Sequence, residues 1–204
     1  MSILDDVVFP WINDIALGKA TTPLRAAVAG RAEGRILEIG AGTGMNFRHY
    51  REDVEVIAIE PAPGMRKRAE ATLLGPDVRA TIRIEDADAR RLPYDAESFD
   101  TVVASFVFCS VKDLEASMRE VRRVLRPGGT LRLVEHVASP SKSVFRWQTR
   151  LRPLWMQVLG GCDPTRDIRA ALGSSGFSVE DLKPVELPLP TLVAAGILGI
   201  AVKT

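Results

Sequence analysis

The stretch EIGAGTGMNFRHY, Glu38 to Tyr50, places Gly40, Gly42 and Gly44 within five residues. An apolar run precedes these glycines, and a segment with helical character follows them. Glycines let the chain turn tightly and let a ligand approach the backbone. In a parallel sheet, a glycine loop after the first strand binds its ligand at the crevice where the strand order reverses. The stretch therefore predicts an open sheet with a small-molecule site at the carboxyl ends of its strands.

Short apolar segments alternate with helical patterns from residue 35 to about residue 138. Five strands are predicted, in the segments RILEIG, VEVIAIE, ATIRIED, FDTVVASFVF and TLRLVEHV. The fourth is almost continuously apolar, as expected of a strand buried on both faces of a sheet. Helices are predicted at RAEATLL and LEASMREVRRVL, the second ending at Pro127. The alternation predicts an α/β fold with a doubly wound, mostly parallel sheet.

The remaining segments complete a single domain spanning residues 1–204 around the core at 35–138. Residues 1–30 have apolar positions at helical spacing and predict a helical cap, interrupted at Pro23. Residues 139–162 predict an amphipathic helical insertion. Residues 163–204 predict a helix followed by an antiparallel pair of strands, SVEDLKPVEL and GILGIAVKT, at the sheet edge. The cap and the insertion are expected to cover the ligand cleft as a lid, which excludes water.

The composition is that of an ordinary globular chain and argues against several classes of partner. The 204 residues carry a formal net charge of +1, so there is no electrostatic case for nucleic acid or an acidic membrane surface. The N-terminus has early acids and no basic region, unlike a secretory signal. The most apolar stretch, Leu192 to Val202, is too short to span a bilayer. We expect a cytoplasmic protein without a transmembrane segment.

Acidic residues follow the strands at the positions where a nucleoside would be recognised. Glu60 ends the second strand, where a carboxylate can accept both hydroxyls of a ribose. Asp88 follows the third strand and can accept from the amino group of an adenine, while the Ala89 N–H can donate to a ring nitrogen. Ser105 ends the fourth strand and can line the ligand. A nicotinamide dinucleotide is disfavoured, because Met45 stands where its fingerprint needs a small residue.

These segments taken together resemble the class I S-adenosylmethionine-dependent methyltransferases. The resemblance rests on LEIGAGTG, IAIEPAPGM, DADARRLPYDAESFD and VLRPGGTLRLVE, in order and spacing over residues 30–138. It implies a seven-stranded sheet with a reversed last strand, and S-adenosylmethionine as cofactor with S-adenosylhomocysteine as product. By this resemblance Glu38 orients the loop and reaches toward the methionine amine, and Met65 packs on the adenine. The implied cofactor-binding residues are Glu38, Gly40, Ala41, Gly42, Gly44, Asn46, Glu60, Pro61, Met65, Asp88, Ala89 and Ser105.

A narrower similarity, to the methyltransferase-like thiol S-methyltransferases, runs from residue 38 nearly to the end of the chain. It rests on GTGMNFRHY, FCSVKD, VLRPGG, VEHV, GGCDPTRD and GIAVK. It implies that the methyl acceptor is a small alkyl thiol. Quinone-ring and phospholipid methyltransferases share LPY…SFD and LRPGG, so these acceptors stay open alternatives. A non-catalytic accessory protein that binds S-adenosylmethionine is another.

The candidate catalytic residues are His136 and Asp163. His136 follows the fifth strand and is either a structural histidine or a proton acceptor. Asp163 either orients the acceptor or caps the next helix. Cys109 and Cys162 form neither a disulfide framework nor a zinc set, and the first is expected to be a small buried side chain. The sequence shows no clustered metal ligands, so no metal is expected.

Overall fold

A single mixed sheet organises the chain in the computed structural model, which describes residues 9–158, 160–179 and 181–204. The strand order is β3-β2-β1-β4-β5-β8-β6, and β7 also pairs with β8. The first five strands are parallel, which confirms the predicted doubly wound sheet. The strand bounds are β1 Arg35–Ile39, β2 Glu55–Ile59, β3 Thr81–Glu85, β4 Phe99–Ser105, β5 Leu125–His136, β6 Phe177–Ser178, β7 Leu182–Glu186 and β8 Ala195–Lys203.

The last strand runs against the others, as expected. β8 is antiparallel to β5 on one edge, and on its other edge it pairs with both β6 and β7. β6 and β7 therefore share one position in the sheet, which gives seven strand positions for the eight strands. Gly199 of β8 lies beside the interruption between them, with φ +147°. A Cβ there would lie 2.1 Å from the Asp181 carbonyl oxygen, so only glycine permits this approach.

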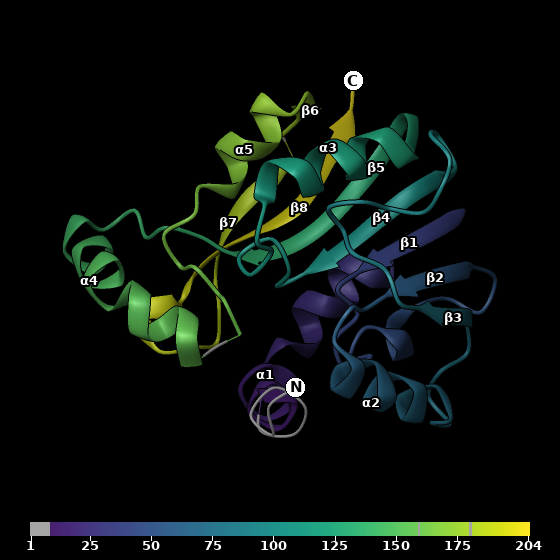
Figure 1. Ribbon diagram of the computed structural model, residues 1–204, viewed down its shortest axis with the longest axis horizontal. Helices are drawn as coiled ribbons and strands as arrows, with labels where there is room; N and C mark the ends of the chain where they lie inside the picture. Colours follow the sequence, from purple (N-terminus) through teal and green to yellow (C-terminus); the bar gives the residue numbers. More distant parts are fainter. Residues whose placement is uncertain (1–8, 159, 180) are drawn as a thin grey trace.

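Helices cover both faces of the sheet, as Figure 1 shows. Met118 and Val121 of α3 (Leu114–Val124) and Ile168 of α5 (Ile168–Ser174) pack into one buried cluster. Val28 of α1 (Phe9–Ala29) and Ala69 of α2 (Pro63–Leu73) pack into the cluster on the opposite face. Val102 and Ala104 of β4 point into the first cluster and Val103, between them, points into the second, as strand geometry requires. The central strands are therefore buried on both sides, and their ends remain available for a site.

The N-terminal cap is a kinked helix. The non-helical backbone lies at Gly18, with φ −58° and ψ −112°, and Pro23 lies inside the helical segment that follows. The predicted break at Pro23 is thus displaced by about one turn toward the N-terminus. A proline ring clashes with the carbonyl of the residue four positions earlier, so a distortion before Pro23 is expected. The predicted cap at residues 1–8 lies outside the described residues.

The predicted insertion after β5 is a helix, α4 (Lys142–Val158), that projects from the side of the sheet (Figure 1). Its main contact is with η3 (Thr191–Val193), and the buried Gln148 amide donates to the Leu192 carbonyl at 2.9 Å. Phe145, Trp147 and Leu154 are exposed. Among the residues that the structure describes, no helix has the length and apolar character needed to cross a membrane.

Candidate active site at the carboxyl edge of the sheet

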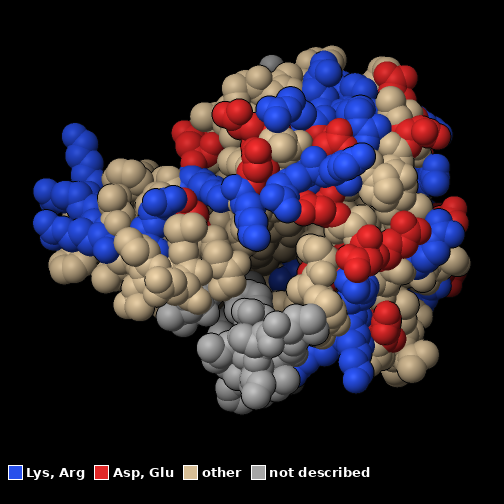
Figure 2. Space-filling model, viewed as in Figure 1, with Lys and Arg blue, Asp and Glu red and all other residues tan. Residues whose placement is uncertain are grey.

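The predicted site residues gather where β1, β2, β4 and β5 end. Glu38 belongs to β1, Glu60 directly follows β2, and Ser105 and His136 are the last residues of β4 and β5. Figure 2 shows the surface hollowed between the part of the molecule that holds α4 and the part that holds α2. Parallel strands bring residues far apart in sequence to one edge, which is where open α/β sheets bind their ligands.

Glu38, in β1 directly before the glycine loop, fixes the position of that loop. Its two carboxylate oxygens accept from Asn46 Nδ2 at 2.9 Å and from the Tyr50 hydroxyl at 2.8 Å. Burial raises the pKa of Glu38 to about 7, while the hydrogen bonds from Tyr50 and Asn46 oppose that rise. Glu38 therefore joins the beginning of the loop to Asn46 and Tyr50, which lie on either side of η2 (Phe47–His49).

Asn46 connects this acid to two further elements. Its amide nitrogen also donates to Ser105 Oγ at 3.1 Å, and its oxygen accepts from Arg25 at 3.2 Å. Arg25 comes from α1, is buried, and lies with its guanidinium 5.2 Å from the centre of the Phe106 ring. The cap helix thus reaches the loop through a charged side chain, a link that sequence reasoning missed because Arg25 lies in no motif.

The glycine loop adopts backbone that other residues rarely adopt. Gly40 has φ +61°, and a Cβ there would lie 2.7 Å from Val107 Cγ2. Gly42 has φ +60°, and a Cβ there would meet no described atom within 4 Å. The Ala41 N–H donates to the Ile59 carbonyl at 3.0 Å and holds the loop against the end of β2. Gly40 is needed for close packing, while Gly42 leaves open space beside the loop.

Glu60 holds the other side of the loop. One of its oxygens accepts from the Gly42 N–H at 2.9 Å and the other from the Ala62 N–H at 2.9 Å. Burial raises the pKa of Glu60, and the two backbone N–H groups oppose the rise. Each carboxylate oxygen can accept a second hydrogen bond. The acid is therefore preset against the loop and keeps capacity for hydroxyl groups of a ligand.

The residues expected around an adenine are present at this edge with different exposure. Met65 and Ala89 are buried, whereas Pro61 is exposed. The Asp88 carboxylate is half exposed and pairs with the Arg90 guanidinium, which lowers the pKa of that acid. An adenine amino group would share this carboxylate with Arg90 or displace it.

Glu135, which sequence reasoning did not select, shapes the acceptor side. It is fully buried at the end of β5 and accepts from three successive backbone N–H groups, those of Val107, Phe108 and Cys109, at 2.8, 2.9 and 3.2 Å. Burial raises its pKa, and these hydrogen bonds oppose the rise. One acid therefore fixes the whole turn after β4. Its position next to His136 in VEHV was the only available signal.

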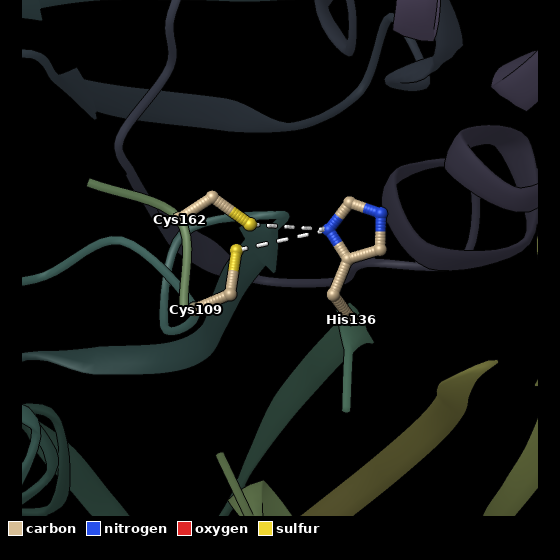
Figure 3. A group of neighbouring side chains, drawn as sticks. All are labelled: Cys109, His136 and Cys162. Atoms are coloured by element: carbon tan, nitrogen blue, oxygen red, sulfur yellow. Dashed lines mark hydrogen bonds between the residues drawn. The ribbon is translucent and has the colours of Figure 1, made fainter. Parts of the chain in front are cut away.

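The two cysteines and His136 meet in one buried cluster (Figure 3). His136 Nδ1 lies 3.9 Å from Cys109 Sγ and 3.7 Å from Cys162 Sγ. The expectation that no metal-ligand types cluster is wrong, because the ends of β4 and β5 and the segment after α4 converge here. The hydrogen bond between the thiols, with burial, raises the pKa of Cys109 well above its usual value, and the same bond lowers the pKa of Cys162. His136 Nε2 is buried and has no hydrogen-bond partner among the described residues.

Asp163 lies beside this cluster, but its carboxylate is already bonded within the protein. It accepts from the Thr165 N–H and hydroxyl at 3.0 and 2.6 Å and from Arg152 at 2.8 Å. Burial opposes these contacts, which together lower the pKa of Asp163. The cap of the following helix is Asp167, which accepts from the Ala170 N–H at 2.9 Å, so the alternative that Asp163 caps that helix is wrong.

S-adenosylmethionine presents an ammonium group, ribose hydroxyls and an adenine, and the described residues suit each of these. The loop has open space at Gly42, Glu38 and Glu60 are buried acids that hold the loop, and Met65 is a buried apolar side chain of α2. The ammonium and hydroxyl groups are donors, and carboxylates are acceptors. The residues present therefore fit the cofactor that the sequence predicts.

Comparison with known proteins agrees with the geometry. The model of the methyltransferase domain family matches residues 37–133. The human thiol S-methyltransferase TMT1A is 37% identical over 171 residues, which cover 82% of this chain and 70% of that protein. The phosphatidylethanolamine N-methyltransferase of Cereibacter sphaeroides is 34% identical over 130 residues, which cover 62% of this chain and 64% of that protein. A solved structure from Thermotoga maritima, described as a possible histamine N-methyltransferase, superposes with a TM-score of 0.69 at 18% identity, covering 99% of each chain.

The reversed last strand β8, the glycine loop and its two acids define a class I methyltransferase fold with S-adenosylmethionine as the cofactor. The chain belongs to the S-adenosylmethionine-dependent methyltransferase family, and it is similar to the thiol S-methyltransferases within that family.

Proposed function

We propose that this methyltransferase transfers its methyl group to the sulfur of a small, mostly apolar thiol. The observation that carries the proposal is the meeting of three segments of the thiol-methyltransferase likeness at one place. Arg166 of GCDPTR donates to the carbonyls of Phe108 and Val111 in the turn after β4. The Asp163 N–H donates to the Cys109 carbonyl at 2.7 Å, and the Ala138 N–H donates to the Arg166 carbonyl at 3.1 Å. These segments would form the acceptor wall.

The chemistry asks the protein to align a nucleophile and remove its proton. When bound, the cofactor supplies an electrophilic methyl group, and the transfer is an in-line displacement. The thiolate is the reactive form of a thiol, whose ordinary pKa is about 8.5. His136, whose Nε2 has no hydrogen-bond partner among the described residues, is the better placed of the two candidate catalytic residues to accept that proton, because the Asp163 carboxylate already pairs with Arg152. Rates should therefore rise as pH approaches the pKa of the thiol.

A second candidate is methylation of a lipid-borne acceptor, a phospholipid amine or a quinol ring. The apolar side chains exposed on α4, including Trp147 at 55% and Leu154 at 62%, favour it. The similarity to a phosphatidylethanolamine N-methyltransferase agrees with this alternative. A non-catalytic role in binding the cofactor is the remaining alternative, because one fold can serve several functions. The cytoplasmic location and the absence of a nucleic-acid partner stay predictions.

Matched acceptors would test the proposal. Methyl transfer from labelled S-adenosylmethionine is followed by mass spectrometry with a small alkyl thiol and with its alcohol, amine and quinol counterparts. We expect product from the thiol alone. His136→Gln should reduce turnover at neutral pH by about 10²–10⁴-fold, the range for general-base assistance, and less at higher pH where the thiol ionises unaided. His49→Gln is the matched control, because His49 belongs to η2 and not to the acceptor wall. Preference for the amine or quinol would reject the thiol assignment.

A further inference from the structure

The cluster of Cys109, His136 and Cys162 is poorly explained by hydrogen bonds among its own members. Both sulfurs approach the same atom, His136 Nδ1, at 3.9 and 3.7 Å. An imidazole nitrogen either donates one proton or accepts with one lone pair, so it cannot make two good hydrogen bonds to two thiols. All three side chains are buried, at 1%, 7% and 7% exposure. The two thiols can bond to each other, but both sulfurs converge on one imidazole nitrogen that can satisfy only one of them.

A metal ion at that point would satisfy all three atoms. Zinc bonds of about 2.3 Å to sulfur and 2.0–2.1 Å to nitrogen, at tetrahedral angles, put sulfur and nitrogen about 3.6 Å apart. The two sulfur–nitrogen separations here, 3.7 and 3.9 Å, exceed that value by a few tenths of an ångström. All three ligand atoms lie within 4.8 Å of one another. Small side-chain adjustments would complete three corners of a tetrahedron.

The backbone that carries each ligand is already fixed. Glu135 accepts hydrogen bonds from three backbone N–H groups and so holds the turn that contains Cys109. His136 is the next residue of the same strand. The segment carrying Cys162 is tied to that turn by the hydrogen bond from the Asp163 N–H to the Cys109 carbonyl. Outer contacts of this kind orient metal ligands and contribute to metal affinity. The ligands are therefore held in place by groups other than the metal.

Charge and burial favour a divalent, thiophilic ion. Two thiolates and a neutral imidazole around a dication sum to zero, and a neutral unit is tolerated in a buried site far better than free charges. Sulfur and imidazole ligands select zinc among the common divalent ions. Three protein ligands with an open fourth position are the pattern of catalytic zinc sites, whereas structural sites use four.

The position of the cluster connects it with methyl transfer. The Phe106 ring lies between the two sites, with its centre 5.2 Å from that of the His136 ring and 5.2 Å from the Arg25 guanidinium. Arg25 in turn contacts Asn46 of the cofactor loop. With Nδ1 bound to a metal, Nε2 carries a proton, and no described residue accepts it. A bound ligand is the remaining acceptor for that proton.

We propose that Cys109, His136 and Cys162 bind a divalent zinc-like ion whose open fourth position takes the sulfur of the methyl acceptor. The acceptor part rests on the proposed thiol function. The S–H bond of the acceptor breaks, its proton leaves to solvent, and its sulfur binds the ion as a thiolate. The new sulfur–carbon bond then forms as the bond between methyl and sulfonium breaks, and that electron pair stays on the sulfur of S-adenosylhomocysteine. The metal-bound thiolate replaces the general-base role proposed above for His136, and the reaction then needs both cysteines as well as the histidine.

The metal site is tested by titrating Co²⁺ into the reduced, metal-free full chain under anaerobic conditions. The chain has only two cysteines, so a sulfur-to-cobalt charge-transfer band can arise from no other residue. We expect one Co²⁺ per chain with that band, displaced by Zn²⁺. Cys109→Ser, Cys162→Ser and His136→Gln should each weaken binding by at least about 10–100-fold, the scale for loss of an outer contact alone. His49→Gln should bind like the parent.

Several results would overturn the site. One is the absence of the band while both thiols are reduced and titratable, and another is an equal band in all variants. A third is a disulfide between Cys109 and Cys162 in protein purified from zinc-supplemented cells, detected as a mass two hydrogens lower. Affinity for S-adenosylmethionine and the thermal melt of each variant show whether it is folded. The two serine variants change one atom each, so one folded variant is enough to decide.

The acceptor role has its own measurement. Adding a small alkyl thiol should change the visible bands of the Co²⁺ protein, and its alcohol counterpart should not. Removing the metal should abolish thiol methylation while the affinity for S-adenosylmethionine stays constant. Visible bands that do not change when the thiol is added, or full activity of the metal-free protein, would refute the acceptor role. If Co²⁺ binds as expected but the enzyme methylates only an amine or a quinol, the proposed function fails and the metal site stands.

Discussion

Replacing Glu60 by glutamine should weaken the binding of S-adenosylmethionine without unfolding the protein. The carboxylate accepts the Gly42 and Ala62 N–H groups at 2.9 Å each, one on each oxygen. An amide would set its own NH₂ group against one of these two donors and would remove the charge that the ribose hydroxyls meet. Loss of a hydrogen bond to a charged group in a site costs about 1.5–3 kcal/mol. That cost corresponds to a rise in Kd of about 10–150-fold.

Isothermal titration calorimetry at pH 8 is the suitable assay, because burial raises the pKa of Glu60 and the acid must be ionised in the parent. Asp167→Asn is the matched control. It also alters a carboxylate that accepts a backbone N–H, that of Ala170, but it does so at α5, away from the glycine loop. The control should keep the parent Kd. Equal Kd values for Glu60→Gln and the parent would refute the role of this acid in binding the ribose.

Three further outcomes are expected. The pKa of Glu38 is raised to about 7 from 4.5, so the folded state holds its proton more tightly, and stability present below pH 4.5 is lost as pH rises through 7. Urea unfolding measured against pH should show a fall in the free energy of unfolding of up to about 3 kcal/mol in the parent, at about 1.36 kcal/mol per pKa unit, and a smaller fall in Glu38→Gln. The same dependence of unfolding free energy on pH in both proteins would contradict this. Gly42→Ala should cost about 1–2 kcal/mol for its positive φ, and its methyl group should also weaken cofactor binding measured by calorimetry, whereas unchanged binding would place the cofactor elsewhere. Deleting residues 1–20 removes part of the predicted lid but keeps the contact of Arg25 with Asn46. We therefore expect a marked loss of turnover with little change in the melting temperature. A truncated enzyme with full turnover would refute the lid.

The sheet could be predicted from the sequence because its signals are local. The first three strands are short apolar runs that end at a glycine or an acid, and the glycine loop identifies the first strand by itself. The same reasoning predicted that the two closing strands pair antiparallel, whereas the reversal of the last strand against the sheet was implied by the family resemblance. Gly18 in place of Pro23 as the break in α1 is a difference of one helical turn. Boundaries of this kind depend on how the two helical segments pack.

The cluster at His136 could not be predicted, because its members are separated by dozens of residues and no spacing rule joins them. Their meeting depends on β4 and β5 being neighbours and on the return of the chain after α4. Arg25 and Glu135 were missed for a similar reason, since each acts through backbone or amide groups of a distant segment. Asp163 was selected for its chemistry, and only the structure shows that Arg152 and Thr165 already engage its carboxylate.

The place of β8 in the sheet has a consequence for how the chain is made. β5 is complete at His136, but its outer edge is paired only when Ala195–Lys203 arrive. During synthesis that edge presents unpaired backbone and the apolar side chains of Leu131 and Leu133, a combination that promotes association between nascent chains. We expect a chain truncated before β8 to sediment as aggregates, and the complete chain to depend on chaperones until its final strand inserts.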